Sequence, residues 1–111
     1  MLLKIKPLSV NEAWQGRRFK TPKYKRYERD ILMMLRPLEV PKGKLKLTIT
    51  YGFSNKASDV DNPCKLFVDC LQKKDGFNDR DIYCLIQHKV DVKKGDEFIE
   101  FDLSVFENSL K

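Results

Sequence analysis

The sequence has few cysteines and no long apolar run. The three cysteines, Cys64, Cys70 and Cys84, are odd in number and lack C-x-x-C spacing, which argues against a zinc site or a disulfide framework and favours a cytoplasmic protein. No apolar run is long enough for a signal peptide or a membrane span, so no membrane partner is expected. Repeats, low-complexity tracts and linkers are also absent. The 111 residues therefore predict a single domain, residues 1–111.

Positive charge is concentrated in one part of the chain. The net charge is +6, and residues 17–36 contain eight basic and two acidic side chains, so this segment alone has the same excess. A block of this kind suits a phosphate backbone or an anionic membrane surface. The alternative is an ordinary helix face exposed to solvent.

Apolar spacing in the first half of the chain predicts a strand, a helix and a second strand. Residues 2–6 are expected to form a short strand, and residues 7–20 an extended polar loop. Thr21-Pro22 is a helix start signal, followed by apolar residues at helical spacing until Pro37. Strict alternation over residues 45–53 predicts the clearest strand.

The second half predicts a helix and two further strands. A helix is expected to begin near Asp61, with Pro63 in its first turn. Leu66 and Cys70 lie on a further side of this helix, which indicates that it is covered on more than one flank, by a second subunit for example. Residues 82–92 and 98–106 read as strands joined by a hairpin turn over residues 93–96. The order β-α-β-α-β-β implies an α/β or α+β fold with a mixed sheet and two main helices.

Acidic side chains gather at two places in this otherwise basic chain. Asp59 and Asp61 stand two residues apart, with Lys65 one helical turn further on, and Asp79 lies near the start of the following strand. Magnesium prefers oxygen ligands, and a few carboxylates suffice to hold it beside a phosphate. Neighbouring strand ends are expected to bring Asp79 to the same edge of the sheet. Lys65 would then neutralise charge on the phosphoryl oxygens.

Each of these residues also has a simpler explanation. Asp61 is a suitable helix cap, and Asp59 an ordinary loop acid. Asp69 stands four residues after Lys65 and can pair with it on the helix surface. The acids near residue 80 can simply shape a turn, and Trp14 can either stack on a base or cover the core.

The acidic motifs together resemble a known family. Asp59-Val60-Asp61-Asn62-Pro63-Cys64-Lys65, Asp69-Cys70-Leu71, Gly76-Phe77 and Asp79-Arg80-Asp81-Ile82 are similar to the D-x-D-N-x-x-K…D-x-L…D-D-x-x-[VI] signature of the RusA-type Holliday junction resolvases. Pro7-Leu8-Ser9-Val10-Asn11, followed by Trp14, resembles the P-x-S-x-N start of that family. The resemblance spans residues 7 to about 103.

The resemblance implies a homodimeric, magnesium-dependent endonuclease, with Mn²⁺ as a substitute and no nucleotide cofactor. Such an enzyme resolves four-way DNA junctions by paired symmetric nicks in recombination and repair. By position, Asp59, Asp61 and Asp79 would be the catalytic metal ligands, Lys65 the catalytic lysine and Asp69 a supporting acid. The residues expected to contact DNA are Asn11, Trp14, Arg17, Arg18, Lys20, Lys23, Lys25 and Arg26.

The chain departs from the family pattern in the second acidic cluster. The paired acids of the signature are replaced by Asn78-Asp79, and the loop before them differs in length, so Asp81 competes with Asp79 for the third ligand position. The same residues are also compatible with two other functions. One is a non-catalytic nucleic-acid-binding module, and the other is a nuclease of looser specificity that acts on flaps or other branched DNA.

Overall fold

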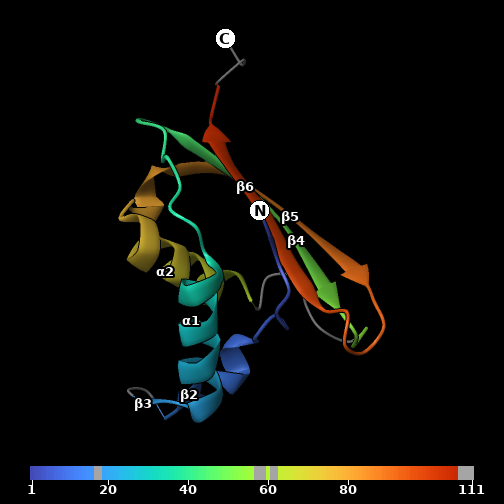
Figure 1. The fold of residues 1–111 in the computed structure, drawn as a ribbon. Coiled ribbons are helices and arrows are strands. Elements are labelled where there is room, and N and C mark those ends of the chain that lie inside the picture. Colours follow the sequence, from blue (N-terminus) through green and yellow to red (C-terminus); the bar gives the residue numbers. More distant parts are fainter. Residues whose placement is uncertain (17–18, 57–59, 61–62, 108–111) are drawn as a thin grey trace.

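The computed structural model describes residues 1–16, 19–56, 60 and 63–107. Within them, two helices pack against a mixed four-stranded sheet, as the sequence predicts, and a small hairpin lies beside the first helix (Figure 1). The strands of the sheet, in spatial order, are β1 (Leu2–Leu3), β6 (Phe98–Val105), β4 (Leu45–Phe53) and β5 (Ile82–Asp91). This is a small α+β domain.

The segment expected as a polar loop has structure of its own. A 3-10 turn, η1, spans Val10–Glu12, and β2 (Trp14–Gln15) pairs antiparallel with β3 (Phe19–Lys20). The first strand is shorter than the expected residues 2–6, because only Leu2–Leu3 pairs with β6. The short strands lack the long alternation by which a strand is recognised in a sequence.

β4 is the centre of the sheet and has the bounds predicted from its alternation. Its odd-numbered residues from Leu45 to Tyr51 are buried, whereas Lys46, Thr48 and Thr50 between them are half-buried. Leu47, Ile49 and Tyr51 share one core with the buried side chains of both helices. Alternation is strict because only one face of the strand packs on the helices.

The first helix, α1 (Pro22–Met34), begins where the sequence predicts. The Thr21 hydroxyl accepts a hydrogen bond from the Tyr24 N–H at 3.2 Å, which satisfies a backbone donor at the helix start. Tyr24, Tyr27 and Ile31 form its buried stripe. The basic side chains lie off this stripe, so the helix packs on the core and still presents positive charge.

The second helix, α2 (Cys64–Asp75), begins later than predicted. Pro63 precedes the helix instead of lying in its first turn, and Asp61 and Asn62 lie outside the described residues. Both flanks of α2 are buried within the single chain, by α1 as well as the sheet, so a second subunit is not needed to explain them. The buried residues of the helix are Leu66, Phe67, Val68, Cys70 and Leu71.

The connection from β5 to β6 is not the hairpin that the sequence predicts. β4 lies between the two strands, parallel to β5 and antiparallel to β6. The physical reason is burial: β6 brings the buried Ile99 and Phe101 beside β4, whereas no residue of β5 is buried and this strand takes the border of the sheet.

The apolar side chains of β5, which the alternation predicts to lie on one face, are divided between the two faces of the sheet. A register shift between Leu45 and Lys46 lets Ile82 pack against the core, whereas Cys84 and Ile86 lie opposite Lys46 and Thr48. Paired residues of adjacent strands point to the same face. Cys84 and Ile86 therefore lie on the face away from the helices.

Candidate functional site

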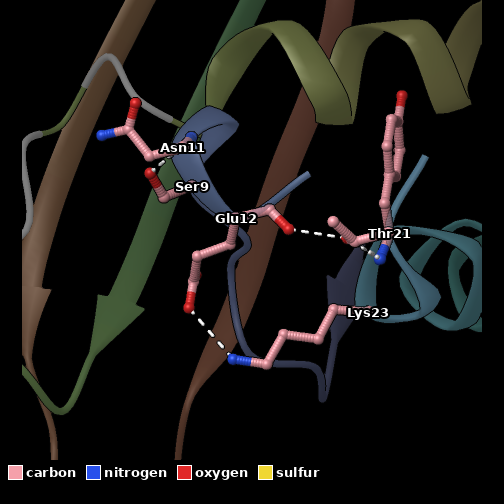
Figure 2. A network of polar contacts seen from close by, with 6 residues as sticks. Ser9, Asn11, Glu12, Thr21 and Lys23 are labelled. Carbon is pink, nitrogen blue, oxygen red and sulfur yellow. Dashed lines mark hydrogen bonds and ion pairs between the residues drawn. The ribbon is translucent and has the colours of Figure 1, made fainter. Parts of the chain in front are cut away.

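The start of α1 and the turn η1 form a connected polar cluster (Figure 2). The Asn11 N–H donates to Ser9 Oγ at 3.2 Å, and the Thr21 hydroxyl donates to the Glu12 carbonyl at 2.7 Å. Lys23 Nζ lies 3.2 Å from Glu12 Oε1. The fold therefore places Asn11 and Lys23, both exposed and both predicted to contact DNA, in one cluster.

Trp14 packs on the domain with part of its surface exposed, and its stacking on a base stays a prediction. Its ring packs edge-on against Tyr24 at 5.4 Å between centroids, yet 39% of the residue is exposed. Lys20 Nζ lies 4.9 Å from the centroid of the same Tyr24 ring. Burial is the main reason why the pKa of Tyr24 is raised to about 12, so this phenol stays neutral and structural.

Phe19 was missed in the sequence and is exposed in the hairpin. This residue is 72% exposed and lies in β3, next to Lys20. The signal in the sequence is an aromatic residue between basic ones, Arg17-Arg18-Phe19-Lys20. Arg17 and Arg18 themselves lie outside the described residues. An exposed aromatic ring among positive charges is suited to stacking on a nucleic-acid base.

Glu28 joins the hairpin, α1 and α2 through two ion pairs. One carboxylate oxygen lies 2.9 Å from Lys20 Nζ and the other 2.9 Å from Lys73 Nζ. Burial alone would raise the pKa of Glu28, but the hydrogen bonds from the two ammonium groups outweigh it and lower that pKa. Lys20 is therefore partly neutralised and contributes less positive potential than an unpaired lysine.

Lys25 and Arg26 are the cations of α1 that are left for a ligand. Both are exposed, and neither has an ion-pair partner within the part of the chain that the structure describes. Together with Lys20 and Lys23 they make up what we call the basic surface. This surface covers the first half of α1 and the adjoining hairpin, so it is suited to a polyanion.

The principal acidic motif lies in the connection between β4 and α2. β4 ends at Phe53 and α2 begins at Cys64, so the predicted strand–helix context of the motif is present, although Asp59 and Asp61 lie outside the described residues. Lys65 lies in the first turn of α2 and is exposed. Its ammonium lies 3.1 Å from Asp69 Oδ1, which is the i,i+4 pairing considered from the sequence.

Asp79 and Asp81 lie in a second 3-10 turn, η2 (Asp79–Asp81), between α2 and β5. The Asn78 side chain accepts a hydrogen bond from the Arg80 N–H at 3.0 Å, which caps the turn. Asp79 is exposed and Asp81 half-buried. Both carboxylates are near solvent, and the structure leaves the choice between them open.

Asp79 lies at the edge of the sheet where β4 begins, not at the predicted edge where β4 ends. β5 runs parallel to β4, and Ile82 at its start pairs with Leu45 at the start of β4. Parallel strands start at the same edge of a sheet, and the helix between them carries the chain back to that edge. The start of β5 therefore lies far from the end of β4. The 12 residues of α2 span about 18 Å. Lys65 and Asp79 thus lie near opposite ends of this helix.

In the described part of the chain, no three histidine, cysteine or acidic side chains lie together as metal ligands. None of the described helices has the length and apolarity required to cross a membrane. A scan against models of known protein families finds no match to this chain, and a search of curated proteins finds no relative.

Proposed function

We propose that the chain is a magnesium-dependent, structure-specific DNA endonuclease of the RusA type, which resolves four-way junctions by paired symmetric nicks in the cytoplasm. The observation that carries the proposal is the motif Asp59-x-Asp61-x-x-x-Lys65, together with its place in the fold. The motif lies in the connection from the central strand β4 to α2, with Lys65 in the first helical turn.

The donor set suits Mg²⁺, with Mn²⁺ as a substitute. Asp59 and Asp61 would hold the ion, which supplies an activated water and stabilises the leaving oxygen when it is bound. Within one chain Asp79 and Asp81 lie near the other end of α2 from Lys65, so a third carboxylate from this pair would have to come from the second copy of the homodimer. The exposed Lys65 would neutralise charge on the phosphoryl oxygens. Asp69 supports this role because its carboxylate, 3.1 Å away, restrains the ammonium group.

The basic surface would hold the DNA arms. Lys25 and Arg26, exposed and without an ion-pair partner among the described residues, are suited to phosphate contacts. Trp14 and Phe19 present exposed ring surface beside Lys20 in the hairpin and would stack on unpaired bases at a branch point. A four-way junction has two-fold symmetry, so a homodimer would present two active sites to opposing strands.

The proposal is tested by incubating the protein with a labelled four-way junction and with a linear duplex of the same arm sequence, each with and without Mg²⁺. Symmetric nicks on the junction alone, and only with the ion, support it. No nicks on either substrate would contradict it. Asp79→Asn and Asp81→Asn, compared in the same assay, identify the third ligand because only the ligand variant should lose cleavage.

A non-catalytic nucleic-acid-binding module is the second candidate. It is favoured by the pairing of Lys65 with Asp69 and by the capped turn that contains Asp79 and Asp81, since both arrangements are also ordinary surface structure. This function predicts junction binding without nicking in any divalent ion. Nicking of flaps as fast as of junctions would instead identify a branched-DNA nuclease of looser specificity.

A further inference from the structure

A small cavity lies beside the first half of α1, between this helix and the segment that follows β1. It encloses about 190 Å³. That is less than the ~300–1,000 Å³ of a site for a drug-sized ligand, and about six times the ~30 Å³ that one water occupies. The cavity therefore has the size of one small planar ring system, such as a nucleobase.

The inner wall of this cavity is apolar. It is formed by Ile5, Pro7, Leu8 and Tyr27, and the last three of these residues are buried. Leu8 and Tyr27 also belong to the hydrophobic core, so the fold holds the wall in place. An apolar wall with a few polar groups around it is the usual construction of a small-ligand site.

The mouth of the cavity carries charged side chains, with an excess of cations. Its two acids, Glu12 and Asp30, each form an ion pair of 3.2 Å with a basic side chain of α1, and Figure 2 shows the first of these pairs. Lys6 and Arg26, also at the mouth, are exposed and have no ion-pair partner in the part of the chain that the structure describes. These two cations are left for an anionic group of a ligand.

The cavity lies toward the edge of the sheet where β4 ends. β1 and β4 are both antiparallel to β6, so both strands end at the same edge. Residues 5–8, which follow β1 and line the cavity, therefore begin at this edge. The connection from β4 to α2, which contains the proposed catalytic motif, leaves the sheet there as well.

We propose that this cavity binds a single unpaired nucleotide, with its base against the apolar wall and its phosphate on Lys6 and Arg26. The faces of a base are planar and apolar enough for the wall, and the phosphate supplies the anion that the mouth requires. Arg26 can also stack its planar guanidinium on the base.

The cavity would give the enzyme a preference among DNA structures, and this consequence rests on the proposed function. Moving a base out of the stack costs least when the base is already unpaired. DNA with an unpaired base near the cut would therefore bind better than a regular duplex. The binding of the nucleotide itself needs no catalysis and can be measured without a divalent ion.

The base contact is tested with a duplex that contains one bulged, unpaired adenine. We expect it to bind about tenfold more tightly than the same duplex with an abasic unit at that position, which keeps the phosphate and lacks the base. Ile5→Trp, which fills the cavity without a change of charge, should reduce this ratio to about one. Val105→Trp, at an exposed residue of β6 near the other edge of the sheet, is the matched control and should keep the ratio. A wild-type ratio of about one, or an unchanged ratio in Ile5→Trp, overturns the inference.

The phosphate contact is tested by Lys6→Ala, a change at an exposed residue that leaves the core intact. It should weaken the binding of the bulged duplex about fivefold or more. Lys4→Ala, an equal loss of charge at an exposed residue outside the cavity, is the control. Equal affinities of the two variants would overturn the contact. Titration with dAMP distinguishes the sources of the nucleotide: binding of dAMP supports a general nucleotide site, and binding of the bulged duplex alone supports a site for a nucleotide within DNA.

The cavity and the proposed function fail in different ways. Base-dependent binding without nicking of branched DNA in Mg²⁺ would contradict the proposed function and support the cavity. Nicking of four-way junctions by a wild-type protein that binds the bulged and abasic duplexes equally would support the proposed function and overturn the cavity.

Discussion

Glu28 on α1 and Lys73 on α2 form an ion pair of 2.9 Å, and the same carboxylate also binds Lys20 at 2.9 Å. We expect Glu28→Gln to lower the free energy of unfolding by about 1 kcal/mol, because both helices lose a partly shielded charged contact. Urea denaturation at neutral pH measures the change. Asp30→Asn, which removes a more exposed pair on the same helix, is the control and should have a smaller effect.

The same carboxylate predicts a pH dependence. The folded-state pKa of Glu28 lies below 4.5 because of its two lysine partners, so its contribution to stability is complete above pH 4.5 and is lost as the pH falls through the folded value. The difference in unfolding free energy between the wild type and Glu28→Gln should therefore shrink in acid. A difference that stays constant as the pH falls below 4.5 would contradict this account.

Gly52 accommodates the ring of Phe98. A Cβ atom added to Gly52 would overlap two ring carbons of Phe98, which lies opposite on β6. We expect Gly52→Ala to cost about 1–3 kcal/mol of stability, since the ring has to move. The double variant Gly52→Ala/Phe98→Ala should lose less than the sum of the single changes in a thermodynamic cycle. Additive losses would show that the ring is not the obstacle.

Lys25 and Arg26 should account for part of the salt dependence of DNA binding. We expect Lys25→Ala/Arg26→Ala to reduce the slope of log affinity against log salt concentration by about 2, if each side chain contacts one phosphate. Fluorescence anisotropy with a labelled junction measures this slope. The control is Lys93→Ala/Lys94→Ala, an equal loss of charge in the connection between β5 and β6. Equal slopes for both variants would show that Lys25 and Arg26 do not contact the DNA.

Asp61 should be required for cleavage and not for binding. Asp61→Asn is expected to abolish nicking in Mg²⁺ while junction affinity stays the same or increases, because the change removes a negative charge beside the phosphates. Gel-shift and nicking assays on the same preparation separate the two effects. Asp96→Asn, in the connection before β6, serves as the control. Full cleavage by Asp61→Asn would contradict the enzyme proposal.

Much of the fold could be predicted from the sequence because its signals are local. The alternation of Leu45–Phe53 and the Thr21-Pro22 start of α1 both depend on neighbouring residues, and both are confirmed. The bounds of α2 were less well predicted, since Pro63 suits the position before a helix as well as its first turn. Asp59 and Asp61, on which the proposed function depends, stay predictions from the motif.

The predictions that are wrong concern the relative positions of segments that are distant in the sequence. A turn over residues 93–96 indicates that the chain reverses, but not that β4 lies between the two strands it joins. The same missing information led to the wrong edge for Asp79, because adjacent strands can be parallel or antiparallel and the acidic motif is equally compatible with both. Strand order depends on which apolar faces are buried together, which a single sequence does not specify.

The position of β6 between β1 and β4 also affects how the protein folds during synthesis. Leu2 pairs with Glu100, and Ile99 and Phe101 of β6 lie in the core, so the sheet cannot be completed until residues 98–105 have left the ribosome. Leu2 and Glu100 are separated by most of the chain, and contacts between residues so far apart in sequence form slowly. The nascent chain therefore presents the open side of β4 to chaperones and proteases until translation has passed β6.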